Sequence, residues 1–139
     1  MEINGIAHVM LTTNDFPRAR RFYGQLLPFL GLTPLVDDER MYYCIGGRTA
    51  LGIQRGDDAY ADEKFVQGRV GLHHVCLRAR NREDVDSLHN HLIAIGATIV
   101  HPPEDAVWAP GYYSVLFEDP DGIRLEMNFV PGKGHLATP

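Results

Sequence analysis

The pentapeptide GIAHV at residues 5–9 recurs as GLHHV at residues 71–75, and this repetition decides how the rest of the chain is interpreted. It places His8 and His74 at equivalent positions, 66 residues apart. Two pairs of glycines repeat at similar offsets, 65 and 75 residues: Gly31 with Gly96, and Gly47 with Gly122. Self-similarity at a nearly constant period indicates duplicated structural units.

Each half predicts the same order of elements: a buried strand, an amphipathic helix, and then further strands. Short apolar runs indicate the strands, and apolar residues at helical spacing indicate the helices. The expected strands are 5–11, 41–46, 48–54, 70–78, 98–100, 112–118 and 123–129. One helix is expected from a cap at Asn14 or Asp15 to Gly31, and a second over 82–95; the Pro-rich segment 101–111 is expected to be a loop.

This order predicts an α+β fold made of two repeated βαβββ modules whose sheets carry helices on one face. The first module is expected at 1–56 and the second at 70–131. A polar linker at 57–69 joins them, and residues 132–139 form a flexible tail, within one compact domain.

Composition excludes several classes of protein. The net charge of −5, without a cluster of basic residues, is contrary to nucleic-acid binding. The chain has no basic-then-apolar leader and no apolar run of membrane-spanning length, so a soluble cytoplasmic protein is expected. Cys44 and Cys76 form no CxxC motif and are interpreted as buried, reduced thiols.

Strand alternation sorts the polar side chains onto faces. In the first strand, His8 is expected opposite the apolar face that meets the helix, and His74 shares its orientation through the repeat. In the last strand, Glu126 is expected on the same side, with Arg124. His73 is expected to point the other way, toward the helix layer, in a structural role.

Two imidazoles and one carboxylate with open positions form the facial set that Fe(II) and related ions accept. A single histidine in an apolar strand is more often a hydrogen-bonded core residue than a ligand. Glutamate, however, is almost never buried in an apolar strand unless it is paired or bound to a metal. Together, His8, His74 and Glu126 therefore predict a site for one divalent metal ion.

The same residues resemble a known family. The two strands that carry His8 and His74, followed by DPDGIRLE at residues 119–126, are similar to the vicinal oxygen chelate superfamily. That superfamily includes glyoxalase I, methylmalonyl-CoA epimerase, fosfomycin and bleomycin resistance proteins, and extradiol dioxygenases. The resemblance covers residues 3 to about 130 and implies a U-shaped sheet cleft with the helices on its outer face.

The resemblance also implies roles for individual residues. His8, His74 and Glu126 fall on ligand positions in the first, fifth and eighth strands, for Fe²⁺, Mn²⁺, Ni²⁺, Zn²⁺ or Co²⁺. Glyoxalase-type members have a fourth ligand, and the equivalent position here is Gly52, which has no side chain. Gln54 on the same face is an alternative fourth ligand if the register slips by two residues.

Extradiol ring-cleaving enzymes place a tyrosine at the position of Leu116 and a second-sphere histidine near 107–109, and both are missing. Tyr112 or Tyr113 is a candidate substitute, although aromatic packing in the strand is the favoured explanation of the pair. Arg124 is a candidate anchor for an anionic substrate, or else an ion-pair partner of Glu118 or Asp121.

The expected function is a metal-dependent glyoxalase-like lyase or isomerase that chelates a small oxygenated metabolite, with Glu126, Tyr113 and Arg124 as catalytic candidates. An Fe(II)-dependent ring-cleaving dioxygenase and a non-enzymatic bleomycin-type binding protein are the alternatives. A homodimer is expected, in which His8 of one copy joins His74 and Glu126 of the other.

Overall fold

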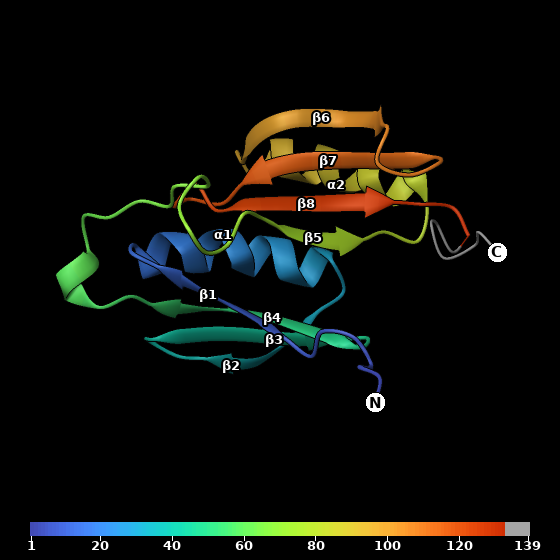
Figure 1. The fold of residues 1–139 in the computed structure, drawn as a ribbon. Helices are drawn as coiled ribbons and strands as arrows, with labels where there is room; N and C mark the ends of the chain where they lie inside the picture. The colour runs from blue at the N-terminus through green and yellow to red at the C-terminus, as the bar shows by residue number, and fades with distance from the viewer. Residues whose placement is uncertain (133–139) are drawn as a thin grey trace. The chain divides into compact units, whose positions relative to one another are not determined.

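The computed structural model describes residues 1–132, and its helices and strands form two α+β units (Figure 1). One unit is Met1–Lys64, and the second begins at Phe65. The first contains β1 (Val9–Thr13), α1 (Phe16–Phe29), β2 (Thr33–Asp37), β3 (Met41–Gly46), β4 (Thr49–Arg55) and a short 3₁₀ helix (Asp58–Tyr60). The second contains β5 (Val75–Arg78), α2 (Arg82–Ala94), β6 (Thr98–Ala106), β7 (Tyr112–Glu118) and β8 (Arg124–Phe129).

The order βαβββ therefore occurs twice, which confirms the predicted fold class. Of the tail expected at 132–139, residues 133–139 lie outside the described residues. No helix within residues 1–132 has the length and apolarity needed to cross a membrane.

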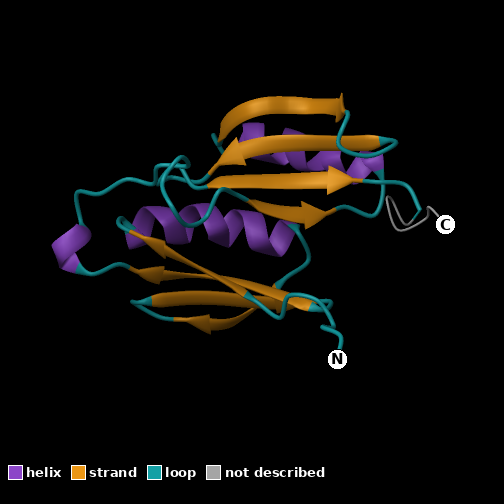
Figure 2. Ribbon diagram, in the orientation of Figure 1, coloured by secondary structure: helices purple, strands orange, loops and turns teal. Residues whose placement is uncertain are grey.

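Both units have the same sheet topology, β1-β4-β3-β2 in the first and β5-β8-β7-β6 in the second. The first and last strands of each unit pair in parallel, and the other pairs are antiparallel. In each unit the helix lies along one face of its own sheet (Figure 2). The opposite face of each sheet is not covered by the helix of its own unit.

Local sequence signals explain where the helices begin. The carboxylate of Asp15 accepts the backbone N–H of Arg18 at 3.0 Å and caps α1, as predicted. Asn81 caps α2 by accepting the N–H of Asp84 at 2.7 Å.

Burial follows the predicted alternation. In β8, Leu125 and Met127 are 2% and 8% exposed, whereas Arg124 and Glu126 are only half-buried. In β3, Tyr42 is 1% exposed and lies under the guanidinium of Arg20 from α1. The even-numbered positions of β8 thus occupy the face that α2 does not cover.

Two edge strands were mispredicted, for one physical reason. β2 was not predicted at all, and β6 continues to Ala106 where a loop was expected from residue 101. Both strands lie at the edge of a sheet, contain prolines and have a shifted register. Because an edge strand needs only one side of its backbone for pairing, it tolerates proline and bulges that suggest a loop in the sequence.

The starts of β1 and β5 were also placed too early, at residues 5 and 70 instead of Val9 and Val75. Gly5 and Gly71 have positive φ angles of 99° and 138°, which are outside the conformations of a regular strand. The histidines of the repeat consequently stand immediately before a strand in each unit.

The turn before β8 is stabilised by Asp119, and we expect its loss to be costly. Asp119 is 4% exposed, and its Oδ1 accepts the N–H groups of Asp121 at 2.9 Å and Ile123 at 2.8 Å. Asp119→Ala should lower the free energy of unfolding by about 2 kcal/mol, because two backbone donors, one of them buried and the other partly buried, lose their acceptor. Urea denaturation measures this, with the exposed-loop variant Asp62→Ala as the control. Equal stability of the two variants would contradict this account.

Candidate metal centre

His74 and Glu126 meet on the open face of the second sheet. The parallel register of β5 and β8 sets Cys76 opposite Glu126, and His74 precedes Cys76 by two residues. As a result, Nε2 of His74 lies 3.3 Å from Oε2 of Glu126. The carboxylate is 12% exposed and the imidazole 35%, so a small molecule or ion can reach the pair.

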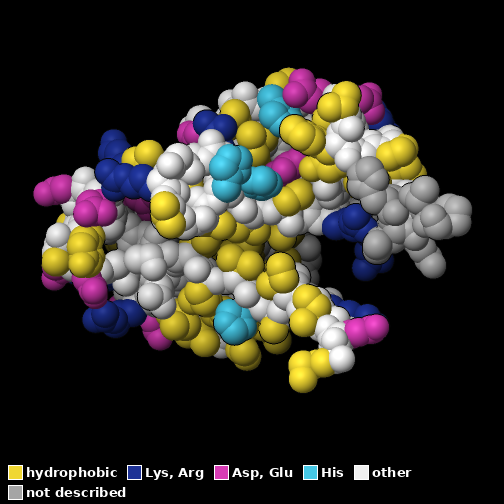
Figure 3. Space-filling model, in the orientation of Figure 1, with side chains coloured by type: hydrophobic (Ala, Val, Ile, Leu, Met, Phe, Trp, Pro, Cys, Tyr) yellow, Lys and Arg dark blue, Asp and Glu magenta, His cyan; other side chains and the backbone are white. Residues whose placement is uncertain are grey.

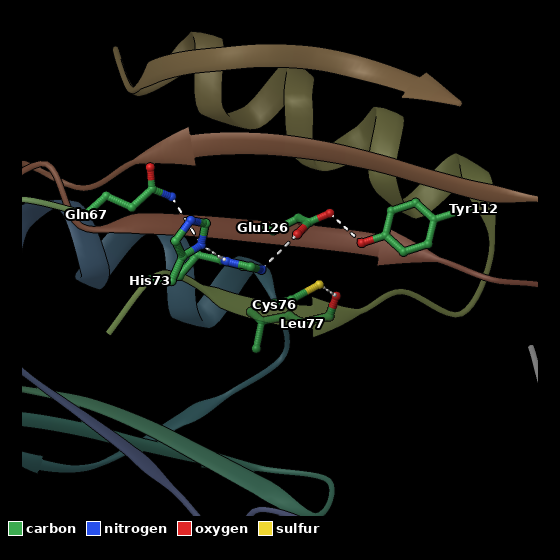
Figure 4. A network of polar contacts seen from close by, with 7 residues as sticks. Gln67, His73, Cys76, Leu77, Tyr112 and Glu126 are labelled. Carbon is green, nitrogen blue, oxygen red and sulfur yellow. Dashed lines mark hydrogen bonds and ion pairs between the residues drawn. The ribbon is translucent and has the colours of Figure 1, made fainter. Parts of the chain in front are cut away.

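A tyrosine holds the other oxygen of this carboxylate. The hydroxyl of Tyr112, from β7, donates to Oε1 of Glu126 at 2.6 Å, and the two side chains point toward one another (Figure 4). Burial, together with this bond to the carboxylate, raises the pKa of Tyr112 above its usual value. Tyr112 therefore stays protonated at neutral pH and fixes one lobe of Glu126 as a donor.

Tyr113 has a different environment from the one expected of a catalytic candidate. Its hydroxyl donates to Asp86 of α2 at 2.6 Å, and its ring lies 3.6 Å from the guanidinium of Arg82. Tyr113 thus belongs to the helix side of the sheet, and the tyrosine at Glu126 is Tyr112.

His73 was expected to face the helix layer, and that expectation is wrong. His73 is exposed, and its Nδ1 lies 2.7 Å from Nδ1 of His74. Histidine side chains (cyan) are visible at the surface beside an acidic side chain (Figure 3). Strand alternation does not apply at residue 73, because Gly71 turns the backbone before β5 begins.

Gln67 is a member of this cluster that sequence reasoning missed. Its amide Nε2 lies 3.3 Å from Nδ1 of His73 (Figure 4). It sits in a turn at residues 66–69, closed by the N–H of Arg69 donating to the carbonyl of Val66 at 3.0 Å. Nothing in the sequence distinguishes it from the other polar residues of the expected linker.

Cys76 adds a thiol beside Glu126. Cys44 is buried as predicted, whereas Cys76 is exposed, so the prediction of a buried thiol is wrong at that position. Burial of the thiol and the negative charge of Glu126 raise the pKa of Cys76 to about 12. The thiol is therefore protonated, and unreactive as a nucleophile, at neutral pH.

The first unit carries His8 at the equivalent position but no equivalent of Glu126. The ring of His8 packs edge-on against Tyr43, with centroids 6.3 Å apart. Met10 pairs with Gly52 as Cys76 pairs with Glu126, so Gly52 occupies the position that corresponds to the carboxylate. A Cβ added at Gly52 would lie 2.8 Å from the sulfur of Met10 and 2.7 Å from a ring carbon of Tyr43.

The remaining candidates lie further along the strands. Gln54 is exposed and pairs with Thr12, four residues beyond His8 on β1. Four residues of strand span about 13 Å, so Gln54 and His8 are not adjacent on their sheet. Nε of Arg124 lies 3.3 Å from Oε1 of Glu118, and this ion pair holds the guanidinium beside β7.

The donor set of the second unit fits a divalent ion. Ligand atoms at about 2.1 Å from an ion, with an angle between them of roughly 100°, are separated by about the distance found between Nε2 and Oε2. Within residues 1–132, however, no group of three or more His, Cys, Asp or Glu side chains is assembled in a form that could hold a metal. His74 and Glu126 are therefore two donors of an incomplete set.

Comparison with known proteins identifies the family. The Glyoxalase/Bleomycin resistance protein/Dioxygenase superfamily model matches residues 5–127, which include every strand of both units except the C-terminal end of β8. The chain belongs to this superfamily.

Individual members of the superfamily are distant in sequence. YqjT, an uncharacterized protein of Bacillus subtilis (strain 168), is 27% identical over 121 residues, covering 86% of this chain and 94% of YqjT. A crystal structure of a provisionally assigned glyoxalase from Bacillus halodurans matches with a TM-score of 0.80 and 27% identity, covering 91% of this chain and 96% of that one. Lactoylglutathione lyase from Agrobacterium tumefaciens shares the fold, with a TM-score of 0.67 and 24% identity over 93% of this chain and 96% of that one.

The proximity of Cys76 to Glu126 leads to a prediction for the metal-free protein. Glu126→Gln removes a negative charge that disfavours the thiolate, so the pKa of Cys76 should fall by roughly one unit at most. Because iodoacetamide reacts with the thiolate, alkylation at pH 8.5 should then become several times faster. Mass spectrometry of the labelled cysteine peptides measures the rate. Glu104→Gln, at an exposed glutamate of β6, is the control, and an unchanged rate in Glu126→Gln would contradict the geometry.

Proposed function

We propose that this protein is a divalent-metal-dependent lyase or isomerase of the glyoxalase type, acting on a small oxygenated metabolite. The observation that carries the proposal is the contact between His74 and Glu126, with the second carboxylate oxygen held by Tyr112. An open-face carboxylate oriented by a protonated phenol and facing an imidazole has the donor chemistry of a metal ligand that can also exchange protons.

In this proposal His74 and Glu126 of one copy of the chain and His8 of a second copy hold the ion. His8 is included because it stands at the position equivalent to His74, one residue before the first strand of its unit. The ion supplies Lewis acidity toward two oxygen atoms of the substrate.

The residues of the chain divide the proton chemistry between them. Oε2 of Glu126 is the oxygen that does not bond to Tyr112, so it would bind the ion or, when detached from the ion, take a proton from a carbon next to a carbonyl. Tyr112 keeps donating to Oε1 and prevents the carboxylate from rotating. We assign the positioning of the base to Tyr112 rather than Tyr113, because Tyr113 is engaged by Asp86.

The proposed site has three protein ligands rather than four. Gly52 occupies the position of a fourth ligand, and the side chains of Met10 and Tyr43 fill the space beside it. Gln54 is four residues from His8 along the sheet, so we propose no role for it in binding the ion. Three ligands leave positions for a bidentate substrate.

An oxidative reaction is the second candidate. The phenol of Tyr112 supplies a proton-handling group near Glu126, although the residue opposite Glu126 on β7 is the apolar Leu116. A three-ligand set also suits Fe(II). A ring-cleaving dioxygenase using Tyr112 is therefore the alternative that the assays below must separate from a lyase or isomerase.

Metal binding tests the ligand set directly. His8→Ala, His74→Ala and Glu126→Ala should each weaken Zn²⁺ or Mn²⁺ binding by at least about 100-fold, because a three-ligand site has little redundancy. Gln54→Ala, the matched control in the first unit, should change the affinity less than about threefold, within the effect of a surface substitution. Isothermal titration calorimetry measures the constants. Near-native binding by two of the three ligand variants would rule out the site.

Activity assays separate the reaction classes. Ni²⁺- or Zn²⁺-loaded protein should convert the hemithioacetal of methylglyoxal and a small thiol or glutathione, and Tyr112→Phe should lower kcat about 10- to 100-fold by loosening the base. Anaerobic Fe(II)-loaded protein offered catechol and then oxygen tests the second candidate. Oxygen uptake with ring cleavage would replace the lyase or isomerase. Tight binding of a bleomycin-type ligand without metal would replace both by a binding protein.

A further inference from the structure

A continuous line of polar contacts extends from the loop before β5 to the carboxylate. Nε2 of Gln67 lies 3.3 Å from Nδ1 of His73, which lies 2.7 Å from Nδ1 of His74, and Nε2 of His74 lies 3.3 Å from Glu126 (Figure 4). The loop residues Gln67 and His73 have no part in the proposed ligand set. Their contacts nevertheless affect which ring nitrogen of His74 is free to bind the ion.

The donors and acceptors in this line fix one another. The amide nitrogen of Gln67 can only donate, so Nδ1 of His73 acts as an acceptor and the proton of that ring is on Nε2. The contact between the two Nδ1 atoms then needs the proton on Nδ1 of His74, which donates to His73. The acceptor nitrogen of His73 has one lone pair, so the bond from His74 at 2.7 Å is the main one and the amide of Gln67 at 3.3 Å makes a weaker second contact. The hydrogen bond that the second nitrogen of an imidazole makes decides which nitrogen is left for a metal.

We propose that His73 is a positioning residue: its Nδ1 accepts the Nδ1–H of His74, so that Nε2 of His74 is presented beside Glu126 as the ligand atom. Gln67 supports this arrangement by holding His73 in the tautomer that accepts. The proposal rests on the proposed function for the identity of His74 as a ligand, but the hydrogen bond itself is independent of any metal.

Simple packing would not produce the same arrangement. The rings of His73 and His74 are inclined by 73° with centroids 5.0 Å apart, a geometry that two aromatic rings adopt without any hydrogen bond. The 2.7 Å separation of the nitrogens is, however, that of a strong hydrogen bond rather than of a ring edge against a face. Second-sphere partners of this kind usually change metal affinity 10- to 100-fold.

Nuclear magnetic resonance of ¹⁵N-labelled protein tests the hydrogen bond. We expect a ¹⁵N–¹⁵N coupling across the bond between the Nδ1 atoms of His73 and His74, with the proton on His74, in both the metal-free and the Zn²⁺-loaded protein. Absence of the coupling together with a bare Nδ1 on His74 would overturn the inference.

Zinc affinity tests the consequence. His73→Phe keeps a ring but removes the acceptor, and should weaken Zn²⁺ binding about 10- to 100-fold. His73→Asn retains an acceptor oxygen and should recover most of that loss, and Gln67→Ala should fall between them. His89→Phe, which changes a histidine of α2 outside the network, is the matched control and should bind as the wild type does.

The outcomes separate the two proposals. Failure of the wild-type protein to bind Zn²⁺ would overturn the proposed function, and the coupling would still decide the hydrogen bond. Wild-type binding that is lost in His74→Ala but unchanged in His73→Phe would overturn this inference alone. Equal weakening of Zn²⁺ binding in His73→Phe and His73→Asn would also overturn it, because the loss would then not depend on whether residue 73 has a hydrogen-bond acceptor.

Discussion

The parallel pairing of the first and last strand in each unit is the constraint on which the candidate site depends. The register that sets Cys76 opposite Glu126 brings the side chain of His74, two residues earlier, to the carboxylate. A shift of one residue would turn Glu126 toward α2, where Leu125 and Met127 now form the core. The burial of Leu125 and Met127 against α2 therefore fixes the register of β8. The same register keeps Glu126 on the opposite face of the sheet.

The same register in the first unit shows how the two repeats have diverged. Met10 and Gly52 hold the positions of Cys76 and Glu126, and Tyr43 packs beside them. One unit thus carries a carboxylate at this position, and the other carries no side chain there, with Met10 and Tyr43 filling the space beside it. Replacing Gly52 by glutamate would not restore a ligand, since its Cβ alone would lie 2.7 Å from Tyr43. The absence of a fourth ligand is thus built into the packing of three residues rather than into one.

The sequence predicted the features that follow from strand alternation and from the internal repeat. It did not predict the residues that lie where the backbone is not a regular strand. Alternation placed Glu126 on the open face, and the repeat placed His8 and His74 at equivalent positions. Alternation could also have selected Tyr112 over Tyr113, because the buried apolar residues of β7, Val115 and Phe117, share the odd numbering of Tyr113. His73 was misplaced because Gly71 interrupts the strand before it. Gln67 was beyond prediction, since a loop residue reaches its partner only through a tertiary fold that carries no periodic signal. The proline-containing edge strands show the same limit, because their pairing depends on a neighbour distant in sequence.

In the second unit, the proposed ligands and the residues that set the tautomer of His74 lie in parts of the chain that differ in rigidity. Within this unit Glu126 lies in β8, Tyr112 begins β7, and His74 directly precedes β5, so these groups are positioned by a hydrogen-bonded sheet. The groups that select the tautomer of His74, Gln67 and His73, come from the segment before β5, where a turn hydrogen bond joins Val66 and Arg69. Local opening of such a loop requires less free energy than opening of the sheet. The position of the ligand atoms therefore depends on the sheet, whereas the tautomer of His74 depends on the less stable segment before β5. A substitution in the loop can change the affinity of the site while leaving the sheet and its register intact.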